Sequence, residues 1–276
     1  MTKRITFFWA LLTFSIAANS QSMDSLKVYI KLIQRGENDS IRKEANRKFY
    51  IGFEKMLHDK DAFTTKFDSL KNISAITSED NKIRLYTWMM PYYDGSKYDY
   101  YGFLQIKTPI LDTLIPLKDS TSTIKKPESE KLGPDRWIGA IYYKIIQVKQ
   151  GKNTFYTLLA WKAKDQMVTQ KLIEILYLDK DKARFGYPII KSGSVFKNRM
   201  IFAFNAQASM TLNFDKNFNG IVFDHMGTNK NNISQINGPD GTYDGLQFKK
   251  GKWLLIRDID VRTKWQPNEN LPEPKE

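Results

Sequence analysis

The sequence predicts an α+β fold that is predominantly β, with N-terminal helices packed on a large, mostly antiparallel β-sheet (a meander, a sandwich or an open barrel). Three observations predict it. Apolar residues recur at helical spacing over residues 22–72 and at a spacing of two from Lys82 onward. Short turn signals separate the strand-like segments, so hairpins and antiparallel pairing are expected. The strand–helix alternation typical of parallel sheets is not seen.

The helical part is predicted to contain two helices and a shorter third piece. The first follows Ser22 and Asp24 and ends at Gly36. The second follows the cap candidates at 38–40. The apolar positions of the second helix are Ile41, Ala45, Phe49, Phe53, Met56 and Leu57. The third piece is expected around Phe63, Phe67 and Leu70. The amphipathic set needs an apolar support, which the sheet supplies.

The β-rich part, residues 82–265, is predicted to hold about ten strands. Asp94-Gly95 is a hairpin turn signal, and residues 227–245 read as a Gly- and Asn-rich loop. The expected strands cover residues 83–89, 98–107, 138–148, 155–161, 171–178, 200–204, 208–214, 221–223, 246–248 and 253–256.

The length and composition are those of a single folded domain. The chain has 276 residues, 41% hydrophobic and 13% aromatic, so it can bury a sizeable core. We expect one domain over residues 21–265 and a flexible tail at 266–276. The Ser-, Thr-, Lys- and Pro-rich stretch 118–134 is predicted to be a loop or linker.

The N-terminus has the pattern of a secretory signal peptide over residues 1–20. Two basic residues precede a short apolar run, residues 5–16, and small residues follow at Ala18 and Ser20. Spanning a bilayer needs roughly 20 apolar residues, so no transmembrane segment is expected after cleavage. The pattern therefore predicts an exported protein, either periplasmic or secreted.

Composition excludes several classes of site. The chain has no cysteine, which excludes disulfides, thiol catalysis, cysteine metal sites and a lipoprotein anchor. It has two histidines, His58 and His225, so a multi-histidine zinc site is not available, and no metal or cofactor is expected. The net charge of +13 is scattered in small groups rather than concentrated in a tail. Together with export, this argues against nucleic acid as a partner.

Asp215 to Gly220 matches the opening of a calcium-binding loop. Such a loop needs a bidentate carboxylate at its twelfth position, which here is Met226. We therefore expect a tight hairpin turn.

His225 is the first candidate catalytic residue. Neighbouring residues of a strand point to opposite faces, so Asp224 cannot pair with His225. A carboxylate from the turn-rich segment 238–245, Asp240 or Asp244, could instead orient His225 as a base. The alternative is a histidine satisfied at the end of a strand, because no nucleophile motif accompanies it. The segment 238–245 itself is explained equally well as a structured loop.

An aromatic group around the Asp94-Gly95 turn is the candidate ligand-binding site. Flat rings near a hairpin tip can stack on sugar rings, although such rings also serve cross-strand packing. The group consists of Trp88, Tyr92, Tyr93, Tyr98, Tyr100 and Tyr101.

Several segments of the C-terminal half are distinctive in their order: 156–161, 171–179, 184–188, 206–210, 221–225 and 238–244. They resemble an uncharacterised family of exported bacterial proteins of the Gram-negative envelope that has no assigned activity. The resemblance spans about residues 60–265. It implies export and one continuous domain, and it implies no reaction or ligand.

Three functional hypotheses follow. The first is a non-catalytic envelope or secreted binding protein that engages a glycan or another envelope component, favoured by the aromatic hairpin and by the lack of a catalytic signature. The second is a hydrolase using His225 with Asp240 or Asp244. The third is a carrier of apolar ligands, with a sheet curved around a cavity.

Overall fold

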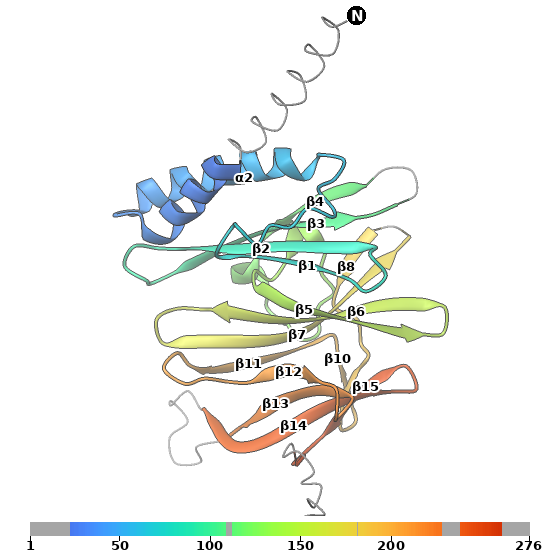
Figure 1. Ribbon diagram of the computed structural model, residues 1–276. Helices are drawn as coiled ribbons and strands as arrows, with labels where there is room; N and C mark the ends of the chain where they lie inside the picture. The colour runs from blue at the N-terminus through green and yellow to red at the C-terminus, as the bar shows by residue number, and fades with distance from the viewer. Residues whose placement is uncertain (1–22, 109–111, 181, 228–237, 261–276) are drawn as a thin grey trace, which may run out of the picture.

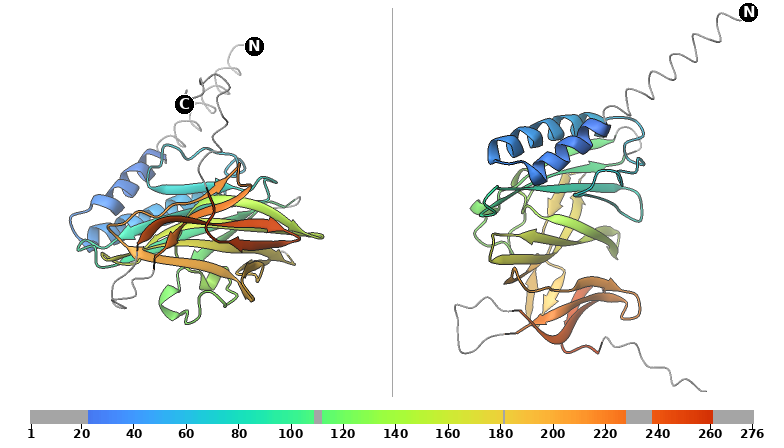
Figure 2. Two further views of the ribbon diagram at one scale, coloured as in Figure 1. Left: turned by 90° about the horizontal axis from the view of Figure 1, so that it is seen from below. Right: turned by 60° about the vertical axis from the view of Figure 1, so that its left-hand side comes forward.

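The computed structural model describes residues 23–108, 112–180, 182–227 and 238–260. Within them, two helices cover one face of a stack of three β-sheets (Figures 1 and 2). The expected α+β, mostly antiparallel fold is confirmed. Its strands, however, are divided among three layers rather than joined in one extensive sheet.

The predicted signal peptide, 1–20, and the predicted tail, 266–276, lie outside the described residues. In the part of the chain that the structure describes, neither helix combines the length and the apolar character needed to cross a bilayer.

The two helices follow the predicted caps. The first covers residues 23–35, and α2 runs from Asp39 to Leu57. Asn38 is the N-cap of α2, and its side-chain oxygen accepts a hydrogen bond from the Ile41 amide at 2.9 Å. His58 is the C-cap.

The expected third helical piece, around residues 63–70, forms turns instead. Arg84 of the first sheet donates hydrogen bonds to the carbonyl oxygens of Ala62 and Phe63, at 3.1 and 2.6 Å. It also donates to the Thr65 carbonyl oxygen at 2.8 Å. These carbonyls would pair internally in a helix, so the arginine replaces helical hydrogen bonds with bonds to the sheet.

The first sheet lies directly under the helices and is an antiparallel meander in the order β1-β2-β3-β4. Its strands are β1 Ile73–Thr77, β2 Ile83–Pro91, β3 Tyr98–Ile106 and β4 Thr113–Lys118.

The middle sheet has the order β11-β7-β6-β5, and β8 pairs with the end of β7. Its strands are β5 Ile141–Gln150, β6 Asn153–Ala163, β7 Val168–Asp179, β8 Lys182–Phe185 and β11 Arg199–Asn205.

The third sheet has the order β10-β9-β15-β14-β13-β12, with one parallel pair, β9 and β15. Residues 239–245, expected in a loop, belong to β14. The predicted strand 208–214 is correct only from Leu212 onward. The strands are β9 Ile190–Ser192, β10 Val195–Lys197, β12 Leu212–Asp215, β13 Gly220–Met226, β14 Pro239–Lys249 and β15 Lys252–Ile256.

Each gap between layers is filled by its own apolar cluster. The helices pack on the first sheet through residues such as Phe53 and Phe103. Leu104 and Leu172 belong to the cluster between the first and middle sheets, and Ile173 belongs to the cluster between the middle and third sheets. The middle sheet is therefore covered on both faces, which explains why most residues of β6 and β7 are buried on both sides of the strand.

The stretch 118–134, predicted to be a loop or linker, starts at the end of β4, contains the short 3-10 helix Thr121–Thr123 and is otherwise a loop up to a second 3-10 helix, Pro134–Arg136. It is anchored to the middle sheet. Leu132 and Phe185 exchange two backbone hydrogen bonds, at 2.8 and 2.9 Å. The Asn198 amide donates to the Glu128 carbonyl oxygen at 2.9 Å. The loop is thus held in place by β8 and by the start of β11.

A fully buried ion pair lies within the middle sheet, and its arginine also reaches the loop. Arg199 Nε lies 2.7 Å from Glu174 Oε1, and both side chains are 0% exposed. The Tyr142 hydroxyl donates to the other carboxylate oxygen of Glu174. Arg199 also donates to the carbonyl oxygens of Pro127, Glu130 and Phe185. Every charged atom is therefore satisfied inside the protein.

We predict that Glu174→Gln lowers the free energy of unfolding by about 3–5 kcal/mol, because it leaves the Arg199 charge buried without a counter-charge. Urea denaturation followed by tryptophan fluorescence measures the loss. Glu44→Gln is the control, since Glu44 pairs with Arg47 at the exposed surface and its loss should have little effect. Equal losses for the two variants would contradict the prediction.

Candidate functional site

A cleft of about 770 Å³ is lined by the start of β3, the end of β4, the end of β6 and Tyr50 of α2, so it extends from the helix-covered side of the first sheet to the middle sheet. This is the left-hand end of the stack in Figure 1, where the β2–β3 hairpin and the β6–β7 turn lie. The two tips touch, because the Gln166 side chain donates a hydrogen bond to the Asp94 carbonyl oxygen. The lining includes four rings, three carboxylates and four lysines: Tyr50, Tyr98, Tyr100, Tyr101, Asp99, Asp119, Asp135, Lys97, Lys118, Lys162 and Lys164.

Lys162 of β6 lines the floor of this cleft and is only 4% exposed. Its ammonium group donates to the Gly139 carbonyl oxygen at 2.6 Å and to Thr121 Oγ1 at 3.1 Å. It lies 4.3 Å from the centre of the Tyr100 ring. Burial lowers the pKa of Lys162 to about 8, and the charge of Asp119 opposes that shift.

Asp119 is fixed against the same floor. Its Oδ1 accepts hydrogen bonds from the Thr121 amide at 2.9 Å and from the Gly139 amide at 3.1 Å. A Cβ atom at Gly139 would lie 2.5 Å from Asp119 Oδ2 and 2.5 Å from Tyr100 Cβ. Only glycine therefore fits between these two side chains, and Lys162, Asp119 and Gly139 form one rigid unit.

The predicted aromatic group is divided between the cleft and the core. Tyr98, Tyr100 and Tyr101 line the cleft, and the hydroxyl of the buried Tyr100 donates to the Ala163 carbonyl oxygen at 2.7 Å. Trp88 is 0% exposed, and its indole nitrogen donates to Asn46 Oδ1 at 2.8 Å. Its assignment to a stacking surface is corrected accordingly: Trp88 is a core residue between α2 and the first sheet.

Tyr92 and Tyr93 lie at the hairpin tip, facing α2. The Tyr92 ring is 4.9 Å from both Lys43 Nζ and Lys97 Nζ. Tyr93 is 61% exposed and is 5.5 Å from the Arg42 guanidinium. Neither residue lines the cleft.

Sequence reasoning missed Tyr50, Asp119, Asp135 and Lys162. One signal was available for Lys162, because it follows Leu158 and Ala160 on the inward face of a strand. A lysine at an inward position needs partners, and those partners come from segments 23 and 41 residues away in sequence.

The structure brings His225 together with the two predicted carboxylates. His225 Nδ1 lies 2.9 Å from Asp244 Oδ2, and its Nε2 lies 3.9 Å from Asp240 Oδ2. Asp224 instead accepts from the Thr211 amide, as expected for neighbours on opposite faces. Hydrogen bonds from the amide and hydroxyl of Thr242 lower the pKa of Asp240.

Arg257 shares the same buried carboxylate. Its Nη1 donates to Asp244 Oδ2 at 2.6 Å and lies 3.2 Å from His225 Nδ1. An ionised carboxylate only accepts, so Nδ1 of His225 must carry a proton in order to bond Asp244. Arginine only donates, so the Arg257–His225 approach is then a contact between two donors that share the Asp244 acceptor. Nε2 of His225 is left facing Asp240. The arrangement orients an imidazole, as a general base requires.

Within the described residues, no group of three or more histidine and carboxylate side chains is arranged to hold a metal ion. The segment 215–220 forms the hairpin turn between β12 and β13, where Asp215 Oδ1 accepts from the Phe218 amide at 2.7 Å.

Comparison of the chain with protein-family models, with curated proteins and with solved structures gives no match. The resemblance to exported bacterial proteins stays a prediction, and functional inference starts from the chemistry of the clefts.

We predict that Lys162→Met flattens the dependence of stability on pH. In the folded protein the pKa of Lys162 is about 8, against an ordinary value of 10.5. Between these values the unfolded chain binds more protons, so Lys162 makes the free energy of unfolding rise with pH, by at most about 1.4 kcal/mol per pH unit.

Denaturation with urea at pH 7, 8.5 and 9.5 measures this slope for the wild type and the variant. The wild type should gain stability relative to Lys162→Met as pH rises through this window. Parallel profiles would show that Lys162 titrates as an ordinary surface lysine.

Proposed function

We propose that the protein is an exported, non-catalytic binding protein of the Gram-negative envelope and that the Tyr98–Lys162 cleft binds a glycan. The observation that carries the proposal is that four tyrosine rings, three carboxylates and four lysines line one cleft. Sugars present C–H faces to aromatic rings and hydroxyl donors to carboxylate acceptors. The volume of about 770 Å³ falls in the range of small-molecule sites.

The cleft is also pre-organised. Asp119 is held by the backbone amides of Thr121 and Gly139, and Tyr100 and Lys162 fix the floor beneath it. Rigid acceptors lose little conformational freedom when a ligand binds, so more of the contact energy appears as affinity.

We predict that Tyr98→Ala weakens glycan binding about 10-fold, because one stacking ring is lost, and that Asp119→Asn weakens it by a similar factor through a lost carboxylate acceptor. A glycan array on the mature protein selects the ligand, and calorimetric titration measures each affinity. Tyr93→Ala is the matched control, since Tyr93 is exposed on the same hairpin but does not line the cleft.

Unchanged glycan affinity in Tyr98→Ala would contradict the assignment of this cleft as the binding site. If no glycan on the array binds, the proposal that the ligand is a glycan is wrong.

The export part of the proposal predicts a mature N-terminus at Gln21. Expression of the full chain in a Gram-negative host, followed by osmotic shock and intact-mass measurement, tests it. Retention of residues 1–20 in the recovered protein would contradict export by a cleaved signal peptide.

A hydrolase remains the second candidate because Asp244, 2% exposed at its side chain, orients His225. Incubation of envelope glycans with the wild type and with His225→Ala separates the two functions. Turnover that disappears in the variant would replace the binding proposal with a catalytic one. The carrier hypothesis needs a cavity between sheets, whereas packed apolar clusters occupy the layers of the described fold.

A further inference from the structure

A second cleft, of about 410 Å³, lies at the other end of β6. Asn153 and Thr154, at the start of β6, line it, whereas Lys162 and Ala163, at the end of β6, line the first cleft. Strand residues advance about 3.3 Å each, so the two clefts are separated by roughly 30 Å along one strand. A single sugar residue bound in one cleft cannot touch the other.

The second cleft forms where the neighbouring strands β6 and β7 diverge. The last paired residues of β6 and β7 at this end are Phe155 and Tyr177. Beyond them, β6 continues to Asn153 in its pairing with β5, while β7 continues to Asp179 in its pairing with β8. The two hairpins diverge, and backbone groups of both strands face the gap between them.

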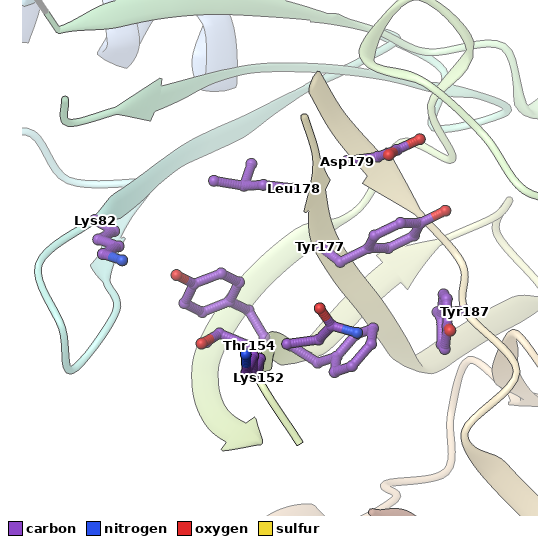
Figure 3. A pocket seen from close by; sticks show the side chains of 10 residues that line it. Lys82, Lys152, Thr154, Tyr177, Leu178, Asp179 and Tyr187 are labelled. Atoms are coloured by element: carbon purple, nitrogen blue, oxygen red, sulfur yellow. The ribbon is translucent and has the colours of Figure 1, made fainter. Parts of the chain in front are cut away.

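One side of the gap is aromatic. Tyr187 packs against Phe155 and Tyr177, with ring centres 4.6 and 5.0 Å apart. Figure 3 shows Tyr177 and Tyr187 on one side of the cleft, and both are partly exposed. Lys131 lies 5.7 Å from the Tyr187 ring and adds positive charge behind it. The Tyr177 and Tyr187 rings are inclined by 70°, so the wall offers two separate ring faces, one of them next to the Lys131 cation.

The other side carries two exposed lysines, Lys82 from the β1–β2 turn and Lys152 from the β5–β6 turn (Figure 3). The first turn is held against β6, because the Tyr156 hydroxyl donates to Asp80 Oδ2 at 2.9 Å. The Lys82 amide donates to Asp80 Oδ1 at 3.1 Å. Lys82 is thus presented by a fixed turn. With Asp179 as the carboxylate of the cleft, the charge of the lining is positive.

We propose that this second cleft is a separate binding site for one acidic sugar residue, whose ring stacks on Tyr177 or Tyr187 and whose carboxylate pairs with Lys82 and Lys152. The sugar class rests on the proposed function, while the anion preference rests on the lysines. The volume suits a single ring rather than a chain of several.

The test is a titration of the isotope-labelled mature protein with D-glucuronic acid, followed by amide chemical shifts. D-Glucose is the matched probe, because it has the same ring without the carboxylate. Shifts are expected at the amides of Thr154 and Leu178, with half-saturation at millimolar concentration and at least about 10-fold weaker response to glucose.

The double variant Lys82→Ala/Lys152→Ala should lose the preference for glucuronic acid. Lys191→Ala/Lys216→Ala removes the same charge from exposed positions outside both clefts and should keep it. Equal responses of Thr154 and Leu178 to the two sugars, no response to either, or an unchanged preference in Lys82→Ala/Lys152→Ala would each overturn the proposal.

The amides of Tyr98 and Lys162 report on the first cleft in the same spectra. If these two amides do not shift while Thr154 does, the result counts against the proposed function of the first cleft and supports the second site. The reverse pattern would remove the second site alone.

Discussion

The buried pair of Arg199 and Glu174 is the constraint on which the rest of the arrangement depends. A charged pair in a fully covered layer is tolerated only when every donor and acceptor is satisfied, since desolvation costs several kcal/mol per ion. Arg199 meets this condition by recruiting carbonyl oxygens of the loop 118–134. The loop is thereby tied to the middle sheet at Pro127 and Glu130. Asp119 and Thr121, at the start of the same loop, line the first cleft and are held by Gly139 and Lys162. The buried charge of the middle sheet and the wall of the first cleft thus share one loop.

The spacing of apolar residues predicted the fold class, because apolar and polar residues alternate along any strand that has one buried and one exposed face. It failed where that contrast is missing. Strands β8, β9 and β10 have three or four residues each, too few to display a period. The start of β14 is rich in glycine and carboxylates, so residues 239–245 look like a turn although their pairing with β13 makes them a strand. The division into three sheets could not be predicted from the sequence. A strand that is buried on both faces has no polar–apolar alternation, and its sequence does not indicate which strands lie beside it.

Part of the candidate site was predictable for the same reason. Tyr98 and Tyr100 share a face of β3 beside a recognisable turn, and both line the cleft. Trp88 is aromatic like these two tyrosines, but it faces α2, where Asn46 accepts a hydrogen bond from its indole nitrogen. The choice between surface and core depended on which side the helices cover. The partner of His225 was likewise fixed by register, because Asp244 lies opposite Phe223 across the β13–β14 pair.

The close packing of the three sheets also limits the places where this protein can bind a ligand. Side chains fill the spaces between sheets, and the clefts at β6 occur where strands end or diverge: at Phe155 and Tyr177 on one side, and beyond Lys162 on the other. Such ends expose backbone groups and hold loops on a rigid support, which is where binding residues are usually found. A single strand of the middle sheet fixes the distance between the two clefts. If a polymer long enough to reach both clefts is bound in one of them, its free part has a high effective concentration at the other cleft. No movement of the protein is needed for this.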